Sequence, residues 1–203
     1  MVGHQEVLYR KVHEKFTADG TGMPTDEEIE EQRDAQIRIM TEACVSHILL
    51  GELRGLEGDE LEEATADALV EAEDIMAQLE DGGVFAELAR EHSTDAGSGA
   101  NGGELGCASP SGWVQAFQDA VMEAPIGEVL DEPVLSEFGY HIIFVRSRTI
   151  PDDEEVIDAI VSDSVSREID SWVNERMGAA TVTVTERFGT WDETGLRVTP
   201  PTA

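Results

Sequence analysis

Apolar residues recur at helical spacing in five separate stretches of the chain. The first stretch follows a capping box made by Thr25 and Glu28, which predicts a helix over residues 26–42. The remaining stripes predict helices over residues 62–79, 85–92, about 113–124 and 157–177. Glycine and proline residues separate these elements, so each helix has a natural end.

Four shorter segments have the pattern of β-strands. Residues 45–50 form a β-branched apolar run, and residues 129–135 and 141–146 are two further strands joined through Gly139. Residues 181–188 alternate like a strand near the C-terminus, and residues 199–203 are expected to be frayed. The order of one strand, several helices and two strands predicts an α+β domain with a small antiparallel sheet, with helical arms on both sides.

The charge of the chain is strongly negative. Its 203 residues include 44 Asp and Glu against 13 Lys and Arg, for a formal net charge of −31, while 40% of the residues are apolar. Such a surface repels phosphate backbones and anionic lipid, which argues against nucleic acid and membrane partners. It also suggests adaptation to high salt, where self-repulsion is screened, although an ordinary acidic protein remains the alternative.

The cysteines and histidines give no metal-binding pattern. Cys44 and Cys107 are 63 positions apart without a second thiol near either, so we interpret both as packed thiols, with a disulfide between them left as the less supported alternative. The five histidines include no close-spaced pair, and no metal site is predicted. Residues 1–16 contain no apolar run long enough for a signal peptide or a membrane span, so the chain as written is expected to be soluble and unexported.

Four segments, in this order, carry a resemblance to a known family: VSHILL at residues 45–50, STD at 93–95, NGGELG at 101–106 and PVLSEFGYHII at 133–143. Together they resemble the parvulins, which are peptidyl-prolyl cis-trans isomerases. The resemblance implies an FKBP-like antiparallel sheet of about four strands with surrounding helices, in a catalytic domain over residues 44–148. Residues 1–43 and 149–203 then resemble the flanking helices of bacterial chaperone-isomerases, which pack together beside that domain.

The resemblance also implies a set of site residues. The polar catalytic residues of the parvulins correspond to His47, Asp95, Ser136 and His141. The residues of their proline pocket correspond to Leu105, Trp113 and Phe117, with Phe138 at the rim. Trp113 stands where many relatives have Met, which reshapes the pocket, and Asp95 in place of Cys excludes a covalent thiol mechanism.

The expected activity is therefore rotation about X-Pro bonds in unfolded or proline-containing polypeptides, without a cofactor. The loop at residues 51–60 has one Arg among four acidic residues, so no specificity for a phosphorylated residue before proline is expected. The alternative function is a non-enzymatic holdase that binds unfolded clients through the apolar faces of residues 29–40 and 157–177. Because relatives of this type often work outside the cytoplasmic membrane, localisation stays open.

Overall fold

The computed structural model describes residue 11 and residues 14–179, 183–192 and 197–200. These fall into two compact units, which we describe separately. Residues 26–160 form the larger unit, and residues 1–25 with 161–203 form the smaller one. Two predictions fall mostly outside the described part of the chain. The prediction about a signal peptide concerns residues 1–16, of which 1–10 are not described, and the predicted frayed end concerns residues 199–203, of which 201–203 are not described.

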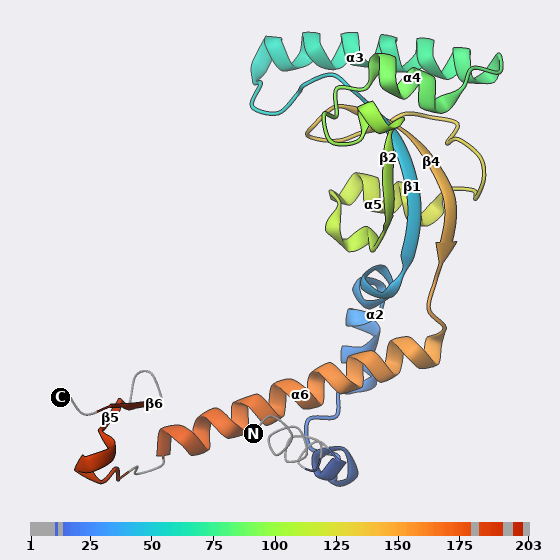
Figure 1. Ribbon diagram of the computed structural model, residues 1–203. Coiled ribbons are helices and arrows are strands. Elements are labelled where there is room, and N and C mark those ends of the chain that lie inside the picture. Colours follow the sequence, from blue (N-terminus) through green and yellow to red (C-terminus); the bar gives the residue numbers. More distant parts are fainter. Residues whose placement is uncertain (1–10, 12–13, 180–182, 193–196, 201–203) are drawn as a thin grey trace. The chain divides into compact units, whose positions relative to one another are not determined.

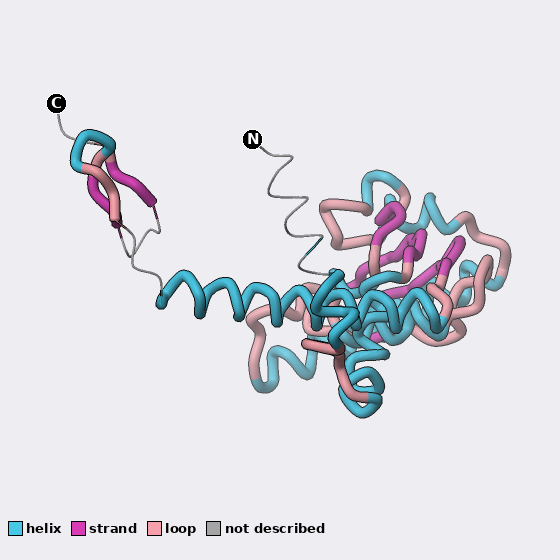
Figure 2. Tube along the Cα trace, turned by 90° about the horizontal axis from the view of Figure 1, so that it is seen from below, coloured by secondary structure: helices cyan, strands magenta, loops and turns pink. Residues whose placement is uncertain are grey.

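The larger unit is built on a four-stranded sheet in the order β2-β1-β4-β3, with every neighbouring pair antiparallel. Figure 1 shows the long strands β1 and β4 side by side, and Figure 2 shows the same strands in magenta among the helices. The strands are β1 (Glu42–Leu50), β2 (Glu104–Ala108), β3 (Val134–Leu135) and β4 (Tyr140–Thr149). The helices of this unit are α2 (Asp26–Met40), α3 (Gly58–Glu80), α4 (Phe85–His92) and α5 (Gln115–Glu123), with short 3-10 turns η1 (Gly99–Asn101) and η2 (Pro110–Gly112) and the start of α6 (Asp153–Ala179).

Side-chain alternation along β1 and β4 divides the core into two layers. Ile48 and Ile142 point to the face covered by α3 and α4, where they pack with Ile75 and Leu88. The opposite face is covered by α5. Its Phe117 and Val121 side chains pack against four buried residues of the two strands, Ala43, Val45, Ile143 and Val145. Because successive residues of a strand point to opposite faces, His47 and His141 fall on the α5 face together with Val45 and Ile143.

Two glycines bring loops against β1 more closely than any other residue would allow. A β-carbon at Gly103 would lie 2.1 Å from the carbonyl oxygen of His47, and one at Gly139 would lie 2.1 Å from that of Leu50. Both glycines have positive φ angles, of 78° and 152°. The backbone on either side of His47 is thereby fixed at short distance from the loops that follow.

Polar contacts from two arginines hold α5 in place. The Arg148 guanidinium donates from Nη1 to the carbonyl oxygens of Val121 and Ala124, and so satisfies the end of α5. Arg38 of α2 forms an ion pair with Asp119 of α5 at 2.8 Å. These contacts fix the helix that carries Phe117.

The smaller unit contains the second part of α6 and a short hairpin. Val165 and Ile169 of α6 are buried, and the Phe16 ring lies edge-on to Trp172 with centroids 6.1 Å apart. After the 3-10 turn η3 (Glu186–Phe188), β5 (Thr190–Asp192) pairs antiparallel with β6 (Arg197–Thr199). Within the described residues, no helix is both long enough and apolar enough to span a membrane.

The interpretation of the cysteines as packed thiols is wrong. Cys44 and Cys107 form a disulfide. They occupy directly opposite positions of β1 and β2, where two side chains on one face come together. Their separation of 63 residues along the sequence gives no sign of this pairing.

One loop prediction and two strand predictions also differ from the structure. β2 lies partly inside the segment predicted as a glycine-rich loop, residues 97–106. Of the predicted strand 129–135, only Val134 and Leu135 form β3. Val129 makes an isolated bridge with Phe144, and a bend at residues 131–132 separates it from β3. The predicted strand 181–188 is wrong for residues 183–188, because the partner strand β6 pairs only with the residues beyond them.

The two compact units do not follow the domain boundaries expected at residues 44 and 148. The unit around the sheet also includes α2 and the first turns of α6. The functional division of the chain into residues 1–43, 44–148 and 149–203 stays a prediction.

Candidate functional site

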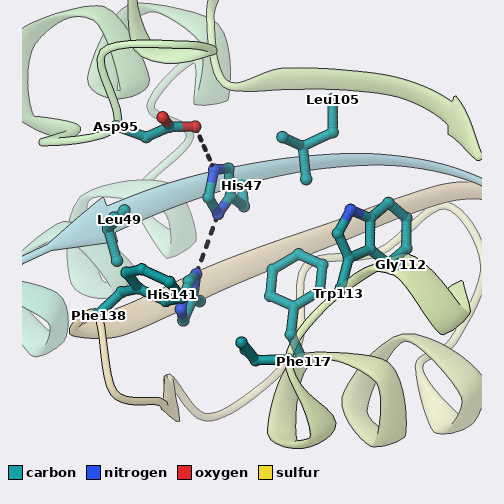
Figure 3. A pocket seen from close by; sticks show the side chains of 10 residues that line it. His47, Leu49, Asp95, Leu105, Gly112, Trp113, Phe117, Phe138 and His141 are labelled. Atoms are coloured by element: carbon teal, nitrogen blue, oxygen red, sulfur yellow. Dashed lines mark hydrogen bonds and ion pairs between the residues drawn. The ribbon is translucent and has the colours of Figure 1, made fainter. Parts of the chain in front are cut away.

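Two histidines on neighbouring strands form the centre of the site. In the antiparallel register of β1 and β4, His141 lies opposite Leu49, one diagonal step from His47. Their rings are stacked at 19° with centroids 5.3 Å apart, and the two Nδ1 atoms are 3.0 Å apart. Both side chains are buried, with 6% and 4% of the residue exposed. Figure 3 shows Asp95, His47 and His141 in a row, with Phe138 beside His141.

Asp95 reaches His47 from the loop that follows α4. This loop is tied to β1, because the Thr94 amide donates to the Leu49 carbonyl at 2.8 Å and the Leu49 amide donates to Ser93 Oγ at 3.1 Å. The Asp95 carboxylate then lies 2.9 Å from His47 Nε2 and also accepts from the Gly97 amide at 2.9 Å. Its orientation is therefore fixed by backbone as well as by side-chain partners.

The site contains one further polar residue that the sequence motifs did not indicate. Ser98 is 3% exposed, and its hydroxyl donates to Asp95 Oδ2 at 2.5 Å while lying 3.1 Å from His47 Nε2. It sits in the glycine-rich segment, where neither periodicity nor motif distinguishes it from a loop serine. Its position three residues after Asp95 is the one available sequence signal.

The surroundings give the three ionisable groups a definite charge at neutral pH. Burial lowers the pKa of His47, although Asp95 opposes the effect. Burial and the neighbouring His47 lower the pKa of His141 to about 4. Burial alone would raise the pKa of Asp95, but hydrogen bonds from Ser98, His47 and the Gly97 amide outweigh it and lower that pKa to about 2. The site therefore holds one carboxylate beside two neutral imidazoles.

These charges fix the direction of every hydrogen bond in the row. An ionised Asp95 only accepts, so His47 donates from Nε2–H and keeps a lone pair on Nδ1. His141 must then donate from Nδ1–H to His47 Nδ1, which leaves His141 Nε2 to accept from the Ser136 hydroxyl at 2.7 Å. The result is one chain of donors that runs from Ser136 through both imidazoles to Asp95.

An apolar hollow of about 330 Å³ opens beside this chain. Trp113 and Phe117 lie edge to face in it with centroids 5.2 Å apart, and the Phe117 ring is 5.1 Å from that of His141. Figure 3 shows Leu105 and Trp113 on one side of the imidazoles and Leu49 and Phe138 on the other. The remaining lining residues are Gly112, Val114 and the His47 and Asp95 side chains.

The structure brings together all eight residues that the motifs indicated. Seven of them line the hollow: His47, Asp95, Leu105, Trp113, Phe117, Phe138 and His141. Ser136 does not line the hollow, and its hydroxyl contacts Nε2 of His141 at 2.7 Å. Over the part of the chain that the structure describes, no cluster of three or more His, Cys, Asp or Glu side chains is arranged to hold a metal ion.

Comparison with known proteins identifies the domain. Residues 31–149 match the family described as the PPIC-type PPIase domain. Chaperone SurA of Chromohalobacter salexigens is 39% identical over 155 residues, which cover 73% of this chain and 34% of that protein. Foldase protein PrsA of Halalkalibacterium halodurans is 35% identical over 165 residues, which cover 81% of this chain and 44% of the relative. The chain thus spans less than half the length of these curated relatives.

The fold is found among solved structures as well. The peptidylprolyl isomerase PrsA from Bacillus anthracis superposes with a TM-score of 0.50 at 21% identity, covering 88% of this chain and 71% of that one. This likeness confirms the predicted α+β fold with its antiparallel four-stranded sheet. The family match over residues 31–149, more than half of the chain, shows that the chain belongs to the PPIC-type family of parvulin peptidyl-prolyl isomerases, as the four motifs predicted.

Proposed function

We propose that this chain is a peptidyl-prolyl cis-trans isomerase that acts on polypeptides without a cofactor and without a covalent intermediate. The observation that carries the proposal is the apolar hollow of about 330 Å³ that lies directly against an ordered polar chain. A proline ring is apolar and fits such a surface, while the amide before it needs polar neighbours.

Rotation about an X-Pro bond faces a barrier of roughly 18–20 kcal/mol because amide resonance is lost as the bond twists. No bond is made or broken. Leu105, Trp113 and Phe117 hold the ring still, so that only the residue before proline turns. Each 1.4 kcal/mol or so by which the site favours the twisted over the planar amide speeds the rotation about tenfold.

The Asp95 carboxylate is placed to favour the twisted amide. A planar amide is stabilised by a resonance form with negative charge on oxygen and positive charge on nitrogen. A fixed carboxylate beside that oxygen disfavours the charge-separated form and so weakens the partial double bond. Because hydrogen bonds hold its pKa at about 2, Asp95 carries this charge at neutral pH. The two neutral imidazoles and Ser136 keep it oriented.

The experiment replaces Asp95 with Asn and with Ala and measures kcat/KM for a proline peptide by exchange NMR, which needs no coupled protease. Both variants are expected to lose at least tenfold, because Asn keeps the shape but not the charge. Asp74→Asn, an exposed residue of α3, is the matched control for loss of one charge and is expected to retain the wild-type rate. Unchanged kcat/KM in both Asp95 variants would remove the proposed role.

The proposed substrates are unfolded or proline-containing chains without a phosphate requirement. Arg54 is the one basic residue in the loop at residues 51–60, and Glu52 and Glu57 lie within three residues of it. A phosphate dianion needs more than one cation to replace its water. We therefore expect peptides with phosphoserine before proline to be turned over no faster than those with serine.

A second activity, holding unfolded clients without isomerising them, is supported by one observation. Helix α2 has no buried residue, and Ile39 and Met40 are 54% and 37% exposed. An aggregation assay with Ile39→Ser separates the two functions: loss of client protection with unchanged isomerisation supports a holding surface on α2, and unchanged protection argues against it. The Asp95→Ala variant should show the opposite pattern.

A further inference from the structure

Strand β2 lies at the edge of the sheet and carries Leu105 into the proline pocket. Its pairing with β1 is irregular at this residue. Glu104 and Gly106 face consecutive residues of β1, which leaves Leu105 between them as one extra residue. Such a β-bulge interrupts the ladder of hydrogen bonds and redirects a side chain. Here the redirected side chain packs against the core beneath α5.

Two side-chain ties hold β2 on either side of this bulge. Before it, Glu104 accepts a hydrogen bond from the Arg146 guanidinium of β4 at 2.7 Å. After it, Cys107 is bonded to Cys44 of β1. Because a bulge weakens local pairing, the position of Leu105 depends on these ties more than that of a residue in a regular strand would.

The two ties differ in strength. The Glu104 and Arg146 side chains are 53% and 34% exposed, and an ion pair this exposed contributes little and is screened by salt. The bond between Cys44 and Cys107 is covalent and does not depend on ionic strength. The disulfide is therefore the stronger of the two ties on β2.

The disulfide lies on the face of the sheet opposite the proline pocket. The two neighbours of Cys44 in β1, Ala43 and Val45, are both part of the core beneath α5, so Cys44 points to the other face. Cys44 is half-buried and Cys107 is exposed. A reductant can thus reach the bond while a substrate occupies the pocket. Since the chain has two cysteines in all, such a reductant has a single target.

We propose that the Cys44–Cys107 disulfide clamps Leu105 in the proline pocket, and that a dithiol reductant weakens substrate binding by opening this clamp. A thiolate of the reductant attacks the Cys107 sulfur, and Cys44 leaves as a thiolate that takes up a proton. The second thiol of the reductant then displaces Cys107, so that two electrons and two protons pass to the protein and the reductant becomes a disulfide. The inference rests on the proposed isomerase function, since it assigns a control to the same pocket.

Opening of the clamp should affect KM rather than kcat. The proline ring stays in place while the residue before it turns, so its contact with Leu105 is the same in the planar and the twisted amide. Loosening this contact weakens the binding of both states equally and leaves kcat unchanged. The polar chain keeps its place, because the Thr94 amide donates to the Leu49 carbonyl and so ties the Asp95 loop to β1.

The test measures KM and kcat for a proline peptide by exchange NMR, with the protein oxidised, reduced by dithiothreitol, and oxidised again. Reduction should raise KM by about threefold or more and change kcat by less than about twofold, and reoxidation should restore the original KM. KM does not depend on the folded fraction, so partial unfolding does not imitate this result. The double variant Cys44→Ala/Cys107→Ala controls for the reagent itself, and should show the raised KM with and without it.

The variant Leu105→Ala separates a clamp on this side chain from a general effect of the disulfide. Its KM should already be raised in the oxidised protein, and reduction should raise it less than about twofold further. A full further rise of about threefold would mean that the disulfide acts elsewhere, which overturns the proposal.

Equal KM values for the oxidised and the fully reduced wild-type protein overturn the clamp while leaving the isomerase function intact. Complete unfolding on reduction, seen as loss of the far-ultraviolet circular dichroism, overturns it too, because the disulfide would then stabilise the whole domain rather than the pocket. Failure of the oxidised protein to turn over the peptide contradicts the isomerase function instead. The clamp is then tested by peptide titration: a higher dissociation constant after reduction supports it, and equal constants or no binding refute it.

Discussion

Acidification from pH 7 to pH 5 is expected to destabilise the folded sheet through His141. Burial and the neighbouring His47 lower the pKa of His141 from 6.5 to about 4 in the folded protein. The unfolded chain takes up its proton at the ordinary pKa. Between these two values the unfolded state binds more protons than the folded state, so stability is present at neutral pH and is lost as the pH falls through this window.

The size of the effect follows from the two pKa values. Their difference corresponds to roughly 3 kcal/mol of unfolding free energy once the pH lies below both, and about 2 kcal/mol of this is lost between pH 7 and pH 5. The lowered pKa of His47 acts in the same direction. Protonation of His141 also breaks the donor chain, since Nε2 no longer accepts from Ser136.

The assay is urea unfolding at pH 7 and pH 5, for the wild-type protein and for His141→Gln. Carboxylates elsewhere titrate in both proteins, so the difference between the two pH dependences isolates His141. The variant is expected to be less stable at pH 7 and to lose about 2 kcal/mol less on acidification. His92→Gln removes a histidine outside the site and serves as the control. Equal pH dependences for wild type and His141→Gln would refute the reasoning.

Three further predictions concern other parts of the molecule. Ser98→Ala removes a donor to Asp95, so the pKa of Asp95 should rise in a carbon-13 titration and kcat/KM should fall severalfold; an unmoved pKa contradicts the geometry. Replacing Cys44 and Cys107 with alanine should lower the unfolding free energy by about 2–4 kcal/mol, measured by urea denaturation against the oxidised wild type. Added potassium chloride should raise the midpoint of thermal unfolding by several degrees because it screens the charge of −31, and a protein equally stable in dilute buffer would exclude adaptation to salt.

The sequence was most informative where motifs and periodicity coincide. His47 and His141 each occur in or beside a short apolar run that predicts a strand, and in the structure the two paired strands bring both rings to one face, where they stack. The family motifs added Asp95 and Ser136, which have no periodicity of their own. Their contacts with the two imidazoles come from loops anchored to the sheet.

Features that depend on pairing register were not predictable. The disulfide requires Cys44 and Cys107 to lie opposite each other, and the register of β1 and β2 shifts between Val45 and Ser46, which no local sequence pattern indicates. β2 itself begins directly after two glycines, whose turn signal masks the strand. Ser98 contacts Asp95 through the fold of the same loop, which propensity does not specify.

Gly103 and Gly139 set a limit on how this protein can diverge. At both positions a β-carbon would lie 2.1 Å from a carbonyl oxygen of β1, so a larger residue there would push its loop away from the strand that carries His47. Because the backbone fixes the width of the pocket, a new substrate preference in this chain can arise only by replacing side chains that line it, such as Trp113 and Phe138.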